Sequence, residues 1–186
     1  HNDWIKSIPY VLIDNEDSAQ IALTSSLIVV RENPKLLDTL AGTLSLSLVK
    51  AGISALTLEL GGAYVVDEKN VRIGVNAVLR ILRQLGLLGT LNATLDVGEP
   101  LTSSVLSASS VKLYGDEPKP TTTGRIKMLV EPGQMIKKGD PLARIESENG
   151  EILETLLAHQ NAVVLGYTDD AISHPGQEIV ALGVGN

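Results

Sequence analysis

Hydrophobic positions in the first half of the chain alternate between strand-like and helix-like spacing. The predicted strands are Ile8–Ile13, Leu27–Val30 and Ala55–Leu60, which are short apolar runs rich in branched residues. The predicted helices are Glu16–Ser25, Leu36–Lys50 and Glu68–Leu85. Asp14 and Asn15 are cap candidates for the first helix, and Gly52 and Gly86 follow the other two. This alternation predicts part of an α/β sheet with helical crossovers.

The helix predicted at Glu68–Leu85 has an apolar side and a polar side. The residues expected to pack inward are Val71, Val75, Val78, Leu79, Leu82 and Leu85. The residues expected on the solvated surface are Arg72, Arg80 and Arg83, together with Arg31 from an earlier segment.

The pattern changes after Leu88 to short apolar runs separated by Gly, Pro and Asp, which predicts small antiparallel β structure with frequent turns. Strands between Leu101 and Leu113 are assigned to the same module. We therefore expect two domains: residues 1–90 form the α/β part, and residues 91–186 form a β domain with linker segments.

Composition narrows the classes of function. The 186 residues are 44% hydrophobic with a formal net charge of −7, so no broad basic surface favours nucleic acid or an anionic membrane. The absence of cysteine excludes disulfides and thiolate metal sites. No apolar run is long enough to span a membrane, and the polar start is unlike a signal peptide. The expected location is cytoplasmic.

Glu59 is the candidate catalytic residue. It lies with Thr57 on one face of an otherwise apolar strand, which ends on Gly61 and Gly62. A carboxylate at the end of a buried strand is costly unless it meets a cation, a metal or hydrogen-bond donors. The two glycines permit a sharp turn and leave space beside the acid. The alternative is an edge-strand glutamate that faces water.

The segment Ala55–Leu88 resembles the succinylglutamate desuccinylase/aspartoacylase family, which consists of zinc-dependent amidohydrolases with the zinc-carboxypeptidase fold. The resemblance rests on a strand ending T-x-E-x-G-G, a short loop, and a helix that closes on Leu85-Gly86. It implies a partial zinc-carboxypeptidase-like α/β/α sheet. It also implies zinc-dependent hydrolysis of the amide bond of an N-acyl amino acid, with Glu59 as general acid/base.

The metal site implied by the resemblance is incomplete in this chain. The family takes a His and a Glu from an H-x-x-E motif, which is absent from the sequence, and a second His further along. By resemblance His1 is that second histidine and a zinc ligand; the alternative is a tag residue or a frayed terminus. His159 and His174 fall in the predicted β domain and are interpreted as turn residues. The chain alone is expected to be inactive.

The segment Val130–Ile145 resembles the hammerhead-type β-barrel modules of biotinyl and lipoyl domains, and the amidohydrolase family often carries a small β domain at this end. Gly133 and Gly139 are expected to make turns, with Ile136 and Leu142 in the core. This predicts a small all-β barrel-sandwich domain. A carrier function is disfavoured, because the expected hairpin tip at Glu146–Glu151 contains no lysine.

Two other functions remain open. One is a non-catalytic β module for assembly or regulation, and the other is a carboxypeptidase-like peptidase on the same fold. The expected partners are an N-acyl amino acid substrate and a missing N-terminal segment of the same protein. A partial sheet is expected to expose an apolar edge, which the missing segment or a homo-oligomer would cover.

Overall fold

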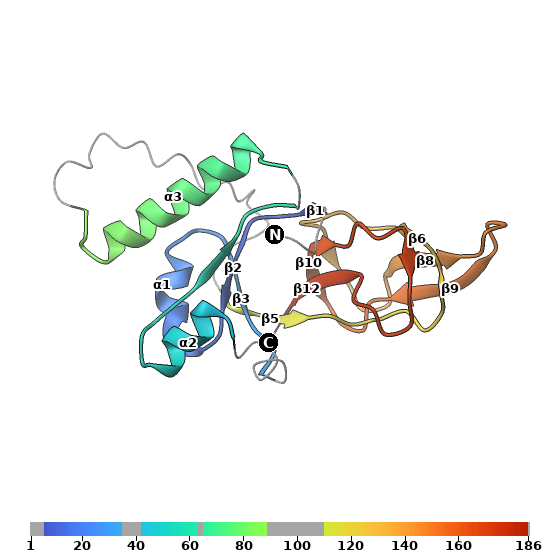
Figure 1. The fold of residues 1–186 in the computed structure, drawn as a ribbon, viewed down its shortest axis with the longest axis horizontal. Helices are drawn as coiled ribbons and strands as arrows, with labels where there is room; N and C mark the ends of the chain where they lie inside the picture. The colour runs from blue at the N-terminus through green and yellow to red at the C-terminus, as the bar shows by residue number, and fades with distance from the viewer. Residues whose placement is uncertain (1–5, 35–41, 63–64, 89–109, 186) are drawn as a thin grey trace. The chain divides into compact units, whose positions relative to one another are not determined.

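A computed structural model describes residues 6–34, 42–62, 65–88 and 110–185, and divides the chain into two compact units (Figure 1). The first, here called the α/β unit, comprises Pro9–Leu60 and Val66–Leu113. The second, here called the β unit, comprises His1–Ile8, Gly61–Val65 and Tyr114–Asn186. The boundary expected near residue 90 lies outside the described residues and stays a prediction.

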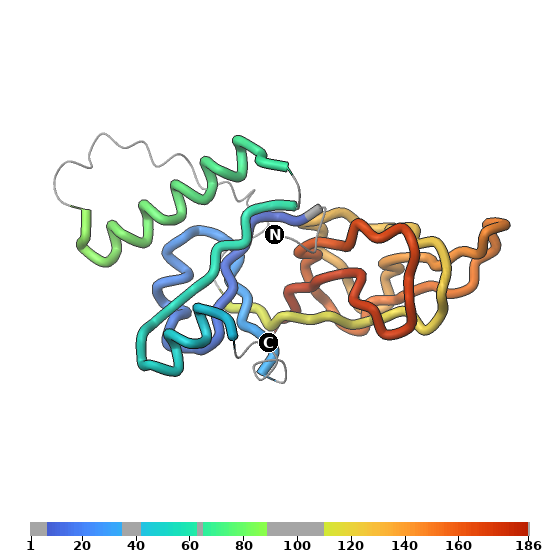
Figure 2. Tube along the Cα trace, in the orientation of Figure 1, coloured from blue at the N-terminus to red at the C-terminus, as the bar shows by residue number. Residues whose placement is uncertain are grey.

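A mixed sheet organises the α/β unit, and its strands run side by side in Figure 2. The strands are β2 (Tyr10–Ile13), β3 (Ile28–Arg31), β4 (Thr57–Glu59) and β5 (Lys112–Gly115). Their order is β5-β3-β2-β4. Strands β2 and β3 are parallel, β5 joins β3 in parallel through Lys112 and Leu113, and β4 is antiparallel to β2. The three predicted strands are therefore confirmed, with β4 shorter than expected.

The helices begin and end where capping residues predict. The 3-10 turn η1 (Glu16–Ser18) and helix α1 (Ala19–Leu23) follow Asn15, whose Oδ1 accepts a hydrogen bond from the Ser18 amide at 3.2 Å. Helix α2 (Leu44–Lys50) follows Thr43, whose side chain accepts from the Leu46 amide. Its predicted start at Leu36 lies outside the described residues. Gly52 and Gly86 both have positive φ, 78° and 69°, just past α2 and α3 (Glu68–Gln84).

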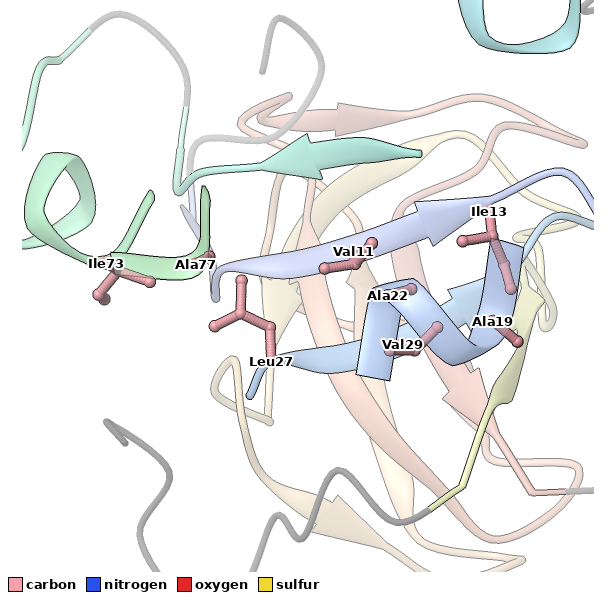
Figure 3. Packing of buried hydrophobic residues seen from close by; sticks show 8 residues of the cluster. All are labelled: Val11, Ile13, Ala19, Ala22, Leu27, Val29, Ile73 and Ala77. Carbon is pink, nitrogen blue, oxygen red and sulfur yellow. The ribbon is translucent and has the colours of Figure 1, made fainter. Parts of the chain in front are cut away.

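One apolar cluster lies between the sheet and its helices, as Figure 3 shows. Its buried members are Val11, Ile13, Ala19, Ala22, Leu27, Val29, Ile73 and Ala77. They come from four separate segments, which exclude water together: β2, α1, β3 with the residue before it, and α3. Burial of apolar surface of this kind contributes about 25 cal/mol per Å². The opposite face of these two strands is also shielded from solvent, because Tyr10, Ile28 and Val30 are buried.

The predicted inward face of α3 is wrong for four of its six residues, and the other two, Leu79 and Leu82, are half-buried. The residues of α3 that are buried are Ile73, Gly74 and Ala77, whereas Val71, Val75, Val78 and the following Leu85 are exposed. The missing side chain at Gly74 lets the helix lie close to Leu60. The apolar surface of the helix is wider than the part that meets this core.

The four arginines that were expected on the solvated surface differ in their exposure. Arg72 and Arg83 are exposed as expected. Arg31 and Arg80 are half-buried, which corrects the expectation that they are solvated surface residues. The Arg31 Nη1 lies 2.8 Å from a Glu16 carboxylate oxygen, and the Arg80 Nη1 donates to the Ser25 carbonyl at 3.3 Å. Arg80 thereby ties α3 to the turn before β3.

Antiparallel strands build the β unit, in two groups. In the first group the central strand is β10 (Ala162–Tyr167). It pairs with β1 (Lys6–Ser7), β12 (Val180–Val184) and β7 (Met135–Ile136). The other has the order β11 (Ile172–Ser173), β6 (Gly124–Met128), β8 (Pro141–Glu146) and β9 (Ile152–Leu157). The described strands close no barrel, so the barrel-sandwich detail of the prediction is not confirmed.

The turns of the β unit are those that the sequence predicts. Gly133 and Gly139 have φ of 86° and 90°, and Ile136 and Leu142 beside them are buried. Strands β8 and β9 join through the turn at residues 147–151, where the hairpin tip is expected. The predicted strands between residues 101 and 109 lie outside the described part of the chain. Among the described residues no helix is both long and apolar enough to cross a membrane.

Candidate functional site

Glu59 is the last residue of β4 and lies directly opposite Tyr10 on β2. Paired residues of antiparallel strands place their side chains on the same face, with Cβ atoms about 5 Å apart. Leu58, the neighbour of Glu59, packs on the core cluster, so the Glu59 side chain points to the opposite face of the sheet. Thr57 shares that face and lies opposite Leu12. The predicted pairing of Thr57 and Glu59 on one face is confirmed.

The backbone on either side of Glu59 is set by local chemistry. After Leu60, Gly61 adopts a φ of 83°, a left-handed conformation that glycine takes without steric cost. Helix α3 then starts at Glu68, after the N-cap residue Asp67, whose Oδ1 accepts a hydrogen bond from the Lys69 amide at 2.9 Å. The sharp turn predicted from the glycines is therefore present, and Glu59 lies at the point where the strand ends.

Helix α3 packs closely behind the site. A Cβ atom on Gly74 would lie 2.5 Å from the Leu60 Cδ1, a distance that requires the leucine side chain to move. Leu60 directly follows Glu59, so the absence of a side chain at position 74 lets the helix lie against the end of β4. Nothing in the sequence pattern marks this contact, because the two residues meet only when the helix docks.

Glu59 is half-buried at the end of β4, so the residue is neither fully exposed nor enclosed in the core. A carboxylate in this position can take a proton from a water molecule and return it to a leaving group within hydrogen-bonding reach. Farther along the same face the strands are covered, because Tyr10, Ile28 and Val30 are 2%, 7% and 0% exposed.

The structure does not bring the histidines to Glu59. His1 lies outside the described residues, and its assignment as a metal ligand stays a prediction. His159 and His174 are exposed residues of the β unit, in turns as predicted. Within the described residues no three His, Cys, Asp or Glu side chains form a group that could hold a metal. The described part of the chain therefore does not fit zinc by its own residues, and no chemical step is derived through zinc.

Sequence reasoning missed Tyr10 as a neighbour of the candidate site. Tyr10 is 2% exposed and stands across from Glu59, although 49 positions separate the two in the printed sequence. Only the register of β2 against β4 brings them together, and register is a long-range property. The only local signal was an aromatic residue inside an apolar run.

Solved structures similar to this chain include proteins of the succinylglutamate desuccinylase/aspartoacylase family. The chain matches succinylglutamate desuccinylase/aspartoacylase from Rhodobacter sphaeroides with a TM-score of 0.70, at 17% identity over 97% of this chain and 55% of that one. It matches the apo structure of the ectoine utilization protein EutE (DoeB) from Ruegeria pomeroyi with a TM-score of 0.72, at 17% identity over 100% of this chain and 58% of that one. It matches an aspartoacylase family protein from Mesorhizobium loti with a TM-score of 0.63, at 16% identity over 97% of this chain and 58% of that one.

The chain shares their fold. The structure neighbours are succinylglutamate desuccinylase/aspartoacylase family proteins and cover nearly the whole chain, which confirms the mixed α/β fold expected from the resemblance. The chain spans little more than half the length of these neighbours. No family model matches the sequence, and no curated protein matches it. Identities this low establish the fold alone.

Proposed function

We propose that this chain is part of a deacylase-type hydrolase that cleaves the amide bond of an N-acyl amino acid or a related small amide. The observation that carries the proposal is Glu59, at the end of β4 and on the face away from the core cluster, in a fold shared with desuccinylase/aspartoacylase family proteins. Neither the fold alone nor the Glu59 carboxylate alone is enough to assign this function, because one fold serves many reactions.

Glu59 acts as the general acid/base in this proposal. Its carboxylate takes a proton from the water that attacks the amide carbon, and the same Glu59 oxygen delivers that proton to the departing amine nitrogen. Proton transfer of this kind contributes roughly two to four orders of magnitude in rate. Zinc, when bound, would polarise the amide carbonyl, and its ligands would come from residues outside the described ranges, with His1 among them.

The test uses the complete gene product and a series of N-acyl amino acids. Glu59→Gln keeps the size of the side chain and removes its capacity to carry a proton, so we expect kcat to fall by about two to four orders of magnitude. The matched control is Glu68→Gln, an exposed residue in the first turn of α3. Zinc content and the thermal midpoint are measured on both variants and are expected to be unchanged.

Two results would reject the proposed role. Full activity of Glu59→Gln would mean that another group transfers the proton. Absence of amide hydrolysis by the intact protein, with folded material and saturating zinc, would favour the non-catalytic assembly module. Cleavage of peptides from the carboxyl end in place of N-acyl amino acids would favour the peptidase alternative on the same fold.

A further inference from the structure

Strand β9 is an edge strand of the four-stranded group in the β unit. It comes last in the order β11-β6-β8-β9, and among the described residues it pairs with β8 and with no other strand (Figure 1). Ala158, at its end, bonds toward β8, since it donates to the Asp140 carbonyl at 2.9 Å and accepts from the Gly139 amide at 2.8 Å. Successive residues of a strand direct their backbone groups to its two sides in turn, so Thr155 and Leu157 face outward.

The edge lacks the usual protection of an exposed strand. Residues 152–157 contain neither lysine nor proline. Glu154 is the only charged residue of the strand, and its carboxylate accepts hydrogen bonds from the Thr121 and Thr122 amides at 2.9 and 3.2 Å. The register shift within β9 lies at its start, between Ile152 and Glu154, so the remainder of the strand is regular.

Apolar side chains accompany these backbone groups. Ile152, Leu153 and Leu157 have exposed fractions of 54%, 48% and 47%. Leu156, by contrast, is 3% exposed and belongs to the small core of the unit. Surfaces normally carry scattered single apolar residues, whereas three in one short edge strand favour an interaction surface.

The two ends of β9 carry opposite charge. At its start, the turn between β8 and β9 holds the exposed Glu148 and Glu151. At its end lies the turn between β7 and β8, which holds the exposed Lys137 and Lys138. The one acid of that turn, Asp140, is half-buried, and its carboxylate accepts a hydrogen bond from the Lys137 amide at 2.8 Å. The exposed charge is therefore negative at the start of the strand and positive at its end.

We propose that β9 pairs in antiparallel orientation with β9 of a second copy of the chain, about a two-fold axis at Thr155. Such a pair suits two-fold symmetry, because each copy contributes the same surface. Thr155 then lies opposite Thr155 of the second copy, Leu153 opposite Leu157, and Glu151 opposite His159. The acidic turn of each copy meets the lysine turn of the other, so both ends of the pair are complementary in charge.

Charge and apolar contact select this arrangement. A parallel pair would bring the two acidic turns together at one end and the two lysine turns at the other, and like charges placed side by side cost free energy. An antiparallel pair centred on Glu154 would set two carboxylates directly opposite each other. A pair centred on Leu156 would place Leu153 opposite His159 and lose its apolar contact.

The interface is small, because it consists of one strand pair with its side chains. Interfaces at the low end of the size range form weak or transient complexes, so dimers are expected at micromolar concentration and monomers below it. The surface belongs to the β unit and is separate from the sheet edge expected from the sequence. It is also independent of the chemistry of Glu59.

The test measures the mass of the complete gene product by sedimentation over a range of micromolar concentrations. We expect a reversible monomer–dimer equilibrium, with slower amide hydrogen exchange at Thr155 and Leu157 in the dimer. Thr155→Lys sets two like charges opposite each other and should weaken association at least about tenfold. The control is Ile172→Lys, at a 45% exposed position of β11 on the other edge of the group, and it should keep affinity within about threefold.

Charge reversal tests the direction of the pair. Lys137→Glu with Lys138→Glu should weaken the dimer several-fold, and so should Glu148→Lys with Glu151→Lys. Both losses should shrink as salt is added, because salt screens exposed charges. The chain with all four changes restores opposite charge at each end and should regain wild-type affinity within about threefold.

Three results would overturn the proposal. They are a monomer at every concentration, a dimer that Thr155→Lys leaves intact, and charge reversals that do not compensate each other. The mass is measured without substrate, so the outcome does not depend on the proposed hydrolysis. A dimer that forms through β9 but cleaves no N-acyl amino acid rejects only the enzyme.

Discussion

Gly74 and Leu60 approach so closely that a Cβ atom at position 74 would lie 2.5 Å from the leucine Cδ1. The contact joins α3 to the residue directly after Glu59. The atom in the way is the end of a flexible side chain, so Leu60 can move aside at modest cost. The contact therefore tests how closely α3 lies against the end of β4.

Gly74→Ala is expected to leave the free energy of unfolding within about 1 kcal/mol of wild type. Alanine favours the helix by about 1 kcal/mol over glycine, and this gain offsets the displacement of Leu60. Gly74→Val adds bulk that the contact cannot absorb and should cost about 1–3 kcal/mol. Chemical denaturation of the three proteins measures both values. Equal stability of Gly74→Val and wild type would show that the helix does not lie against Leu60.

Ile145 and Ile152 allow the same substitution at a buried and an exposed site of the β8–β9 hairpin. Ile145 is fully buried in a small core with Ala143, Leu156 and Ile179, whereas Ile152 is 54% exposed. Ile145→Ala is expected to cost about 2–5 kcal/mol through lost burial and the cavity left behind. Ile152→Ala should cost less than about 1 kcal/mol. Similar losses in a urea titration would contradict the described packing of β8.

Glu154 is expected to make the β unit sensitive to acid. Burial raises the pKa of its carboxyl, but hydrogen bonds from Thr121 and Thr122 outweigh burial and hold the pKa below the ordinary glutamate value of 4.5. One oxygen accepts from both amides and from the Thr122 hydroxyl, at 2.9, 3.2 and 3.0 Å. Because the folded pKa is lowered, this stabilisation is present above the unfolded pKa and is lost as pH falls through the folded pKa.

The corresponding measurement is the free energy of unfolding between about pH 6 and pH 3. Wild type should lose stability with falling pH more steeply than Glu154→Gln, whose amide does not titrate. Glu148→Gln, at an exposed position of the hairpin turn, is the control and should keep the wild-type slope. If the slopes of Glu154→Gln and wild type coincide, the bonds from Thr121 and Thr122 do not favour the ionised carboxylate.

Ser26 holds a conformation that favours glycine. Its φ is 63°, the only positive φ of a non-glycine residue in the described ranges, in the turn between α1 and β3. A left-handed conformation costs an L-residue about 1–2 kcal/mol, and glycine loses part of that gain because its unfolded chain is more flexible. Ser26→Gly should therefore raise stability by about 0.5–1 kcal/mol.

The neighbouring serine provides the comparison for that turn. Ser25 is fully buried, and its hydroxyl accepts a hydrogen bond from the Leu27 amide at 3.1 Å. Ser25→Gly should destabilise the protein by about 1–3 kcal/mol, because the buried amide loses its partner. Thermal or urea unfolding of the two variants should give shifts of opposite sign. A loss of stability in Ser26→Gly would contradict the strain at that position.

The sequence by itself determined the local elements of this protein. Asn15, Gly52 and Gly86 predicted helix boundaries, because caps and left-handed glycines act within a few residues of where they stand. Gly133 and Gly139 predicted turns for the same reason. The position of Glu59 at the end of an apolar strand was likewise readable, since alternation along a strand assigns its side chains to two faces.

Only the tertiary structure decided which surfaces meet. Apolar residues lie on more than one side of α3, so several inward faces are compatible with the pattern. In the structure Ile73 and Ala77 join the core cluster and Gly74 lies against Leu60, whereas Val71, Val75 and Val78 are exposed. The register that sets Tyr10 opposite Glu59 depends on how two strands far apart in the chain align. Periodicity records how apolar each side of an element is, whereas the choice of partner depends on the shape of the surface it packs against.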